Sequence, residues 1–214
     1  MLFRTRLDAG RALGERLASY FGRPNLRVLG LPRGGIPVAF EVARRLGAPL
    51  DVFVVRKLGV PGQEELAMGA IATGGIRVVN KDVVSAMGIS EATLDRVAGA
   101  EEAELQRREK AYRGSRPALD VSGATVIIVD DGLATGSTMR AAVAALREQK
   151  PSAIVVAVPV AAPSTREEMA REVDDMVCVA TPDPFLAVGR FYEDFSQTTD
   201  EEVHDLLARA AQRG

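Results

Sequence analysis

The sequence predicts an α/β protein built on a parallel sheet with helices on both faces. Short apolar segments rich in β-branched residues alternate with helical patterns along the chain, which is typical of such sheets. The length of 214 residues and the hydrophobic content of 47% are enough for a single domain, 1–214, with a full core. In this Rossmann-like arrangement ligands bind beyond the C-terminal ends of the strands, so functional residues are expected in the loops that follow them.

Five strands and five helices are expected in alternation. The strands cover residues 26–31, 51–58, 124–131, 153–161 and 176–182. The helices cover residues 7–21, 36–46, 139–149, 164–173 and 199–212. The glycine-rich residues 59–80 are expected to form a long, mobile hairpin loop with two short β-like pieces. Residues 82–113, dense in Glu, Arg and Ala, predict one or two exposed helices in a helical insertion at 82–118.

Charge and composition exclude several classes of function. The formal charge of −2 gives no electrostatic basis for binding nucleic acid, so no nucleic-acid partner is expected. No apolar run reaches membrane-spanning length, and the first residues lack the apolar core of a signal peptide. The single cysteine, Cys178, allows no internal disulfide, and the single histidine, His204, makes histidine-based chemistry unexpected. We therefore expect a cytoplasmic protein without membrane association.

The most informative segment is VIIVDDGLATGST, residues 126–138. A buried strand ends at Asp130 and Asp131, a loop of small residues follows, and then a helix begins. Backbone N–H groups in such a loop and at a helix N-terminus bind anions, and Gly136 lets the backbone approach the anion closely. Hydroxyl groups are offered by Thr135, Ser137 and Thr138. The aspartates can accept hydrogen bonds from vicinal hydroxyls, directly or through magnesium, so the segment predicts a sugar-phosphate site.

This segment resembles the signature of the type I phosphoribosyltransferases, which bind 5-phosphoribosyl 1-pyrophosphate (PRPP). The resemblance implies a transferase that moves the phosphoribosyl group to a nitrogen acceptor, with Mg²⁺ as cofactor. It also implies that Asp130 and Asp131 are catalytic and that Ala134 lies in the substrate-binding loop. A plain strand-to-helix turn would explain the Ser and Thr residues but not two adjacent aspartates. Gly132 departs from the family pattern, which has a larger apolar residue there.

Basic residues follow the first two expected strands. The resemblance implies that LPRGG, residues 31–35, is the pyrophosphate-binding loop, with Arg33 and Gly34 contacting the diphosphate. Arg56 and Lys57 close the second expected strand and suit a pyrophosphate leaving group, although a solvated strand end explains them equally well.

The family resemblance extends to two further segments. Residues 59–80 correspond to a flexible hood loop, in which Glu64 or Glu65 could close over the site. Residues 181–196 are similar to the base-binding segment of the 6-oxopurine branch, with Phe185 stacking on a nucleobase and Asp194 near a second magnesium ion. The spacing before Asp194 is one residue longer than in that branch, and the aromatic residues could instead pack under the last helix.

The acceptor is not fixed by the sequence. The 6-oxopurine branch has an aspartate at the position of Ala134 and a lysine after the following strand, and residues 157–165 contain no lysine. Hypoxanthine and guanine are therefore expected to be poor acceptors. A non-catalytic PRPP-responsive regulator and a flavodoxin-like phosphate-binding module are the alternatives to an enzyme. The helical insertion is either a hood or an arm that forms a homodimer.

Overall fold

A computed structural model describes residues 2–212 and divides them into a core and a projecting arm. The core contains a five-stranded parallel sheet with the strand order β2-β1-β6-β7-β8. Its strands are β1 (Leu26–Gly30), β2 (Leu50–Val52), β6 (Thr125–Val129), β7 (Ala153–Val160) and β8 (Asp175–Ala180). The predicted parallel sheet is therefore confirmed, with β6 at its centre.

Helices cover both faces of this sheet. They are α1 (Arg6–Arg16), α2 (Gly35–Leu46), α5 (Ser137–Glu148), α6 (Pro163–Glu172) and α7 (Asp200–Ala211), with short 3-10 helices η1 (Ala18–Tyr20) and η2 (Val188–Phe191). Successive strand residues point to opposite faces. Ile127 and Val129 of β6 accordingly pack with α1, α2 and α7, whereas Val126 and Ile128 pack with α5 and α6. This burial on both faces explains why the strand is apolar throughout.

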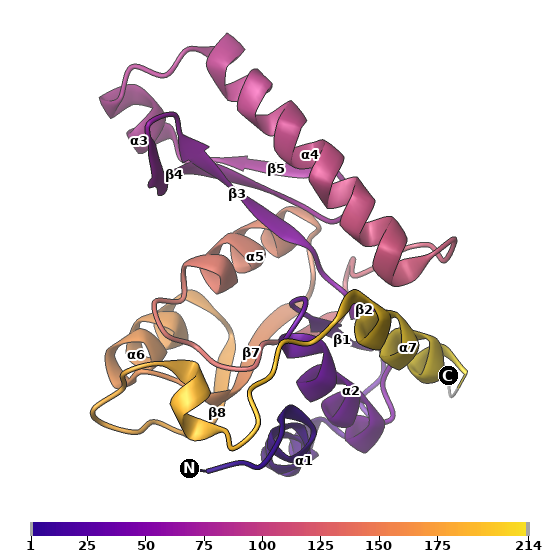
Figure 1. The fold of residues 1–214 in the computed structure, drawn as a ribbon. Helices are drawn as coiled ribbons and strands as arrows, with labels where there is room; N and C mark the ends of the chain where they lie inside the picture. Colours follow the sequence, from indigo (N-terminus) through magenta and orange to yellow (C-terminus); the bar gives the residue numbers. More distant parts are fainter. Residues whose placement is uncertain (1, 213–214) are drawn as a thin grey trace.

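The arm is a separate antiparallel sheet of β3 (Val55–Val60), β4 (Gln63–Ala72) and β5 (Ile76–Val79). It carries α3 (Lys81–Ala86) and the long α4 (Glu91–Arg113), which Figure 1 shows running along the arm. The predicted strand 51–58 was wrong as a single element, because the chain leaves the parallel sheet after β2. Thr73 fixes this crossing, since its Oγ1 accepts from the N–H of Val54 at 2.9 Å.

The two β-like pieces expected within residues 59–80 are observed in β4 and β5, but the segment contains less loop than its glycine content predicted. β4 pairs with β3 on one side and β5 on the other, so most of the segment is regular sheet. Gly59 allows close approach within this hairpin, because a Cβ there would lie 2.7 Å from the carbonyl oxygen of Glu64. Only the turn between β3 and β4 and the start of β4, residues 61–66, are exposed as a run.

A buried ion pair anchors the C-terminal end of α4 to the core. Nε of Arg113 donates to Oδ1 of Asp51 at 3.0 Å, and its Nη2 donates to the carbonyl oxygen of Val52 at 3.0 Å. Oδ2 of Asp51 also accepts from the N–H of Leu119 at 3.0 Å. The helices expected within residues 82–113 are observed as α3 and α4, and the last turn of α4 is joined to β2, the edge strand of the parallel sheet.

Among residues 2–212, no helix combines the length and the apolar composition that a membrane crossing requires.

Candidate active site

The two aspartates lie at the C-terminal end of β6, against the loop that follows β1. Gly34 and Gly35 are needed for this approach. A Cβ at Gly34 would lie 2.0 Å from Oδ2 of Asp131, and one at Gly35 would lie 2.8 Å from the carbonyl oxygen of Val129. The predicted pyrophosphate loop and the Asp-Asp pair are therefore brought together at the edge of the sheet.

Burial dominates the electrostatics of the aspartate pair. It raises the pKa of Asp130 well above its usual value, and the neighbouring Asp131 carboxylate raises it further. Burial also raises the pKa of Asp131, although the hydrogen bond from Arg6 opposes the shift. The pair is thus held in a site that favours a cation or hydroxyl donors as its ligand.

Arg6 joins this site from α1, although no sequence motif marks it. Its Nε donates to Oδ2 of Asp131 at 2.8 Å and its Nη1 donates to the carbonyl oxygen of Ser196 at 2.7 Å. Its guanidinium lies 3.9 Å from the centre of the Phe195 ring. Arg6 therefore connects the aspartate pair to the C-terminal part of the predicted base-binding segment.

The loop after the aspartates presents a row of unpaired N–H groups. Within the described residues, no N–H of residues 134–138 donates a hydrogen bond. The loop carbonyls, by contrast, are engaged elsewhere. Oγ1 of Thr165 donates to the oxygen of Ala134 at 2.6 Å, and Nη1 of Arg140 donates to that of Thr135 at 2.8 Å. Gly136 has a left-handed backbone, with φ of 74°, directly before α5.

These groups line a cavity of about 150 Å³ beside Asp130. The hydroxyl groups of Thr135, Ser137 and Thr138 belong to the same exposed rim. The combination of free N–H groups, hydroxyls and the N-terminus of a twelve-residue helix is chemically suited to bind a phosphate. The structure thus brings the residues predicted to bind phosphate together at one rim, and their role stays a prediction.

The unusual Gly132 has a local explanation. A Cβ at this position would lie 2.4 Å from Cγ1 of Val188, which comes from η2. Val188 lines the phosphate cavity and fills the space that a larger residue at position 132 would need. The departure from the family pattern is therefore matched by a side chain from a distant segment.

Arg33 lies in the loop between β1 and α2, after a cis peptide bond from Pro32. Its Nη1 lies 3.5 Å from Oδ1 of Asp200, at the start of α7. Arg33 is half-buried and has no other side-chain partner among the described residues. Apart from this one contact its guanidinium donors are unpaired among the described residues, so they could bind an anion.

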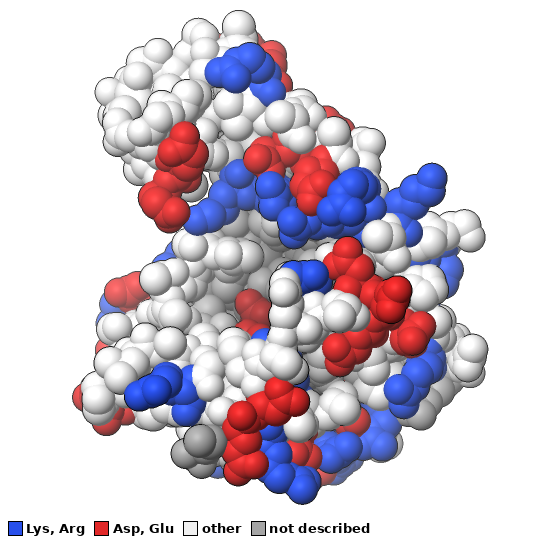
Figure 2. Space-filling model, viewed as in Figure 1, with Lys and Arg blue, Asp and Glu red and all other residues white. Residues whose placement is uncertain are grey.

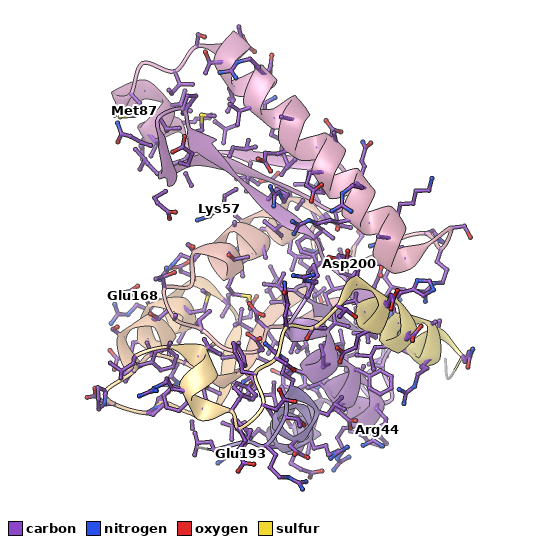
Figure 3. The ribbon with its side chains drawn as sticks, in the orientation of Figure 1. Arg44, Lys57, Met87, Glu168, Glu193 and Asp200 are labelled. Atoms are coloured by element: carbon purple, nitrogen blue, oxygen red, sulfur yellow. The ribbon has the colours of Figure 1, made fainter. Side chains whose placement is uncertain are left out.

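Arg56 and Lys57 lie on the arm, in β3, and not at the end of a parallel strand as predicted. Arg56 is paired with Glu101 of α4 at 2.6 Å. Lys57 makes no ion pair among the described residues, and Figure 3 shows it on the side of the arm that faces the core. Figure 2 shows a hollow between arm and core, with basic side chains along its arm side. Lys57 is thus the better placed of the two cations to reach a ligand.

The candidate carboxylates Glu64 and Glu65 lie at the exposed turn of the arm. They line a cavity of about 480 Å³ together with Arg56, Lys57 and Arg96. Arg96, from α4, was not identified from the sequence. The arm therefore provides both acidic and basic groups close to the hollow.

The predicted base-binding residues are less clearly part of the site. Phe185 is half-buried against Phe191, with ring centres 5.1 Å apart. Asp194 is exposed and its carboxylate accepts from the N–H of Ser196 at 2.9 Å, which lowers its pKa. The alternative that these aromatic residues pack together describes their positions well, although they lie beside η2 and not under α7.

A magnesium ion fits this site only if the substrate supplies ligands. Within residues 2–212, no three Asp, Glu, His or Cys side chains converge as a metal-binding group, so Asp194 does not complete one with Asp130 and Asp131. Two carboxylates are nevertheless suitable oxygen donors for a hard cation that also binds phosphate oxygens. Asp130 and Asp131 are therefore the residues that would hold magnesium together with a diphosphate.

Comparison with known proteins places this geometry in a family. The model of the phosphoribosyl transferase domain matches residues 4–195, which include the aspartate pair and the phosphate loop. The chain belongs to the phosphoribosyl transferase family. The predicted resemblance is thereby confirmed over most of the sequence.

Two relatives illustrate the similarity. A Mycobacterium tuberculosis protein named as a candidate phosphoribosyl transferase is 49% identical over 209 residues, covering 98% of this chain and 47% of that protein. The chain therefore spans about half the length of the curated relatives it matches. The crystal structure of TT1426 from Thermus thermophilus has a TM-score of 0.89 at 42% identity, covering 98% of this chain and 99% of that one.

Proposed function

We propose that this phosphoribosyl transferase family member transfers the 5-phosphoribosyl group of PRPP to a nitrogen acceptor and releases pyrophosphate. The observation that carries the proposal is the placement of Asp130 and Asp131 beside the unpaired N–H groups of residues 134–138. A 5-phosphate bound by these groups would bring the ribose hydroxyls to the carboxylates. Membership of the family supports the same reading.

The reaction breaks the bond between C1 of the ribose and the pyrophosphate oxygen and forms a bond between C1 and the acceptor nitrogen, which loses a proton. Positive charge develops on the sugar ring during such a transfer. Asp130 and Asp131 would accept hydrogen bonds from the ribose hydroxyls, and their negative charge would stabilise the ring. Glu64 and Glu65 are the candidates for accepting the proton, since they line the cavity at the tip of the arm.

Departure of pyrophosphate leaves negative charge that must be neutralised. Arg33 would contact the diphosphate from the loop after β1, and Lys57, with Arg56, would approach from the arm across the hollow. A magnesium ion bound with the diphosphate would supply further Lewis-acid stabilisation. Closure of the arm tip would exclude water from the reacting carbon.

Pyrophosphate release tests the proposal directly. The protein is incubated with PRPP, Mg²⁺ and one of a panel of acceptors: adenine, uracil, hypoxanthine, guanine and nitrogen nucleophiles that are not nucleobases. Turnover with any acceptor, and its loss in Asp130→Asn/Asp131→Asn, is the expected result. Binding of PRPP without release of pyrophosphate in the whole panel would instead support the PRPP-responsive regulator, and a chain that binds no PRPP would refute both readings.

A further inference from the structure

We infer that Asp200 is a positioning residue for Arg33 and that, through Tyr112, it couples the arm to the loop that would bind the diphosphate. The inference rests on the proposed function and adds to it a residue beyond the matched family region. The family match ends at residue 195, and Tyr112 belongs to the helical insertion. Figure 3 shows Asp200 at the junction of arm and core.

One carboxylate oxygen of Asp200 meets groups from two separate parts of the chain. Oδ1 accepts a hydrogen bond from the hydroxyl of Tyr112 at 3.2 Å and lies 3.5 Å from Nη1 of Arg33. Tyr112 comes from α4 of the arm, and Arg33 comes from the loop after β1 of the core. Asp200 is therefore the point at which the arm helix and the diphosphate loop share a partner.

The helix turn that carries Asp200 and the tyrosine that donates to it are both fixed in place. Thr199 caps α7, because its Oγ1 accepts from the N–H of Glu202 at 3.1 Å, and this fixes the first turn that carries Asp200. Tyr112 is 1% exposed, and the next residue, Arg113, makes the buried ion pair with Asp51. Burial and Asp200 both raise the pKa of Tyr112, so its hydroxyl remains a donor.

The contact with Asp200 orients Arg33 and leaves most of its N–H groups unpaired within residues 2–212. A guanidinium has five N–H donors, and only Nη1 of Arg33 faces a partner among the described residues. The other N–H groups of Arg33 are unpaired in the described part of the chain, so they stay available for a bidentate contact with phosphate oxygens. The 3.5 Å separation from Asp200 is also long for a charge-assisted hydrogen bond. If Asp200 instead blocked anion binding, it would have to pair with the same N–H groups of Arg33 that bind the anion.

Calorimetry with three ligands separates a positioning role from a general structural one. The ligands are magnesium pyrophosphate, PRPP with Mg²⁺, and ribose 5-phosphate, which lacks the diphosphate. Asp200→Asn keeps the shape of the side chain and removes its charge, and we expect it to weaken the first two ligands about fivefold, which corresponds to about 1 kcal/mol. Binding of ribose 5-phosphate should not change, because residues 134–138 would hold its phosphate.

Three further variants sharpen the test. Glu201→Gln is the matched control, because Glu201 is also an acidic residue in the first turn of α7, is exposed, and makes no side-chain hydrogen bond or ion pair among the described residues. It should leave all three affinities unchanged. Tyr112→Phe should weaken pyrophosphate binding in the same direction as Asp200→Asn, and Asp200→Glu should restore part of the loss.

The outcomes distinguish this inference from the proposed function. Unchanged or tighter pyrophosphate binding in Asp200→Asn would overturn the positioning role, and so would an equal loss for ribose 5-phosphate. The proposed function would survive either result, because the wild-type protein would still bind PRPP. A wild-type protein that binds none of the three ligands would overturn the proposed function and the inference together.

Discussion

Arg6 and Asp131 are 125 residues apart in the sequence and form a 2.8 Å ion pair at the C-terminal end of the central strand β6. Both side chains are nearly buried, with exposed fractions of 12% and 15%. The pair offsets part of the cost of burying two adjacent carboxylates. It also joins α1 to the loop that would bind PRPP.

Replacing Arg6 should weaken PRPP binding because Asp131 would lose its orienting partner. We expect Arg6→Gln to lower the affinity about tenfold, or about 1.4 kcal/mol. Calorimetry with PRPP and Mg²⁺ measures the change. Arg16→Gln is the control, since Arg16 is exposed on the same helix and makes no side-chain hydrogen bond or ion pair among the described residues. Equal affinities in the two variants would contradict a role for Arg6.

The aspartate pair itself should be required for magnesium-dependent binding. We expect Asp130→Asn/Asp131→Asn to lose at least about tenfold in PRPP affinity, roughly 1.4 kcal/mol, because two hydroxyl acceptors lose their charge. Calorimetry with and without Mg²⁺ is the measurement, and circular dichroism confirms that the variant is folded. A folded double variant with wild-type affinity would rule out the assignment.

The raised pKa of Asp130 has a consequence for stability. A folded-state pKa above the ordinary value means that this carboxyl group is most favourable to folding when neutral, and that its contribution is lost as the pH rises through the raised pKa. Asp130→Asn cannot ionise, so without magnesium it should unfold about 2–4 °C above the wild type at pH 8, or about 1 kcal/mol. The difference should shrink at pH 5.

Asp194→Asn should change the unfolding temperature in the opposite direction in the same experiment. The pKa of Asp194 is lowered by hydrogen bonds at Ser196, so its charge favours folding above the ordinary pKa. This variant should therefore be no more stable than the wild type at any pH between 5 and 8. Thermal unfolding in a chelator measures both variants, and a gain for Asp194→Asn alone would reverse the electrostatic assignment.

The tip of the arm is the part that should respond to ligands. Residues 61–66 are an exposed run at the β3–β4 turn and the start of β4, whereas most of the rest of the predicted loop at 59–80 is paired sheet. Hydrogen exchange should therefore slow at 61–66 when PRPP and an acceptor analogue bind, with little change in the β4–β5 ladder. Equal protection of the tip with and without ligands would remove its role as a lid.

Hypoxanthine and guanine should be poor acceptors. Ala134 lines the phosphate cavity with a methyl group, which cannot pair with a polar atom of a 6-oxopurine. Steady-state kinetics with hypoxanthine, guanine, adenine and uracil compare the values of kcat/KM. A highest value for hypoxanthine or guanine would show that Ala134 does not determine specificity.

The sequence predicted the parallel sheet because its strands are buried on both faces and read as continuous apolar segments. It misplaced Arg56 and Lys57 because residues 51–58 also form such a segment, although β2 and β3 belong to different sheets. Glycine density suggested a loop at 59–80, but Gly59 and Gly69 allow strands to approach closely. A local pattern does not reveal which sheet a strand joins.

The residues missed at the site share a different cause. Arg6, Val188 and Asp200 act through partners more than 50 residues away. Arg6 and Asp200 lie in no recognisable motif, and Val188 lies in the predicted base-binding segment, where its contact with Gly132 was not foreseen. Their roles depend on which elements the fold places side by side. Only Gly132 gave a signal, since an unusually small residue in a phosphate loop indicates that another side chain fills its space.

The buried pair of Arg113 and Asp51 also determines how the chain can be dissected. Deleting the arm would leave Asp51 at the edge of the sheet without its cation, and stranding a buried charge in this way costs about 3–5 kcal/mol. The loss is a large part of the stability of an ordinary domain. The arm is therefore not a removable module: arm and sheet should melt in one cooperative transition, and a shortened chain would need a neutral residue at position 51 to remain folded.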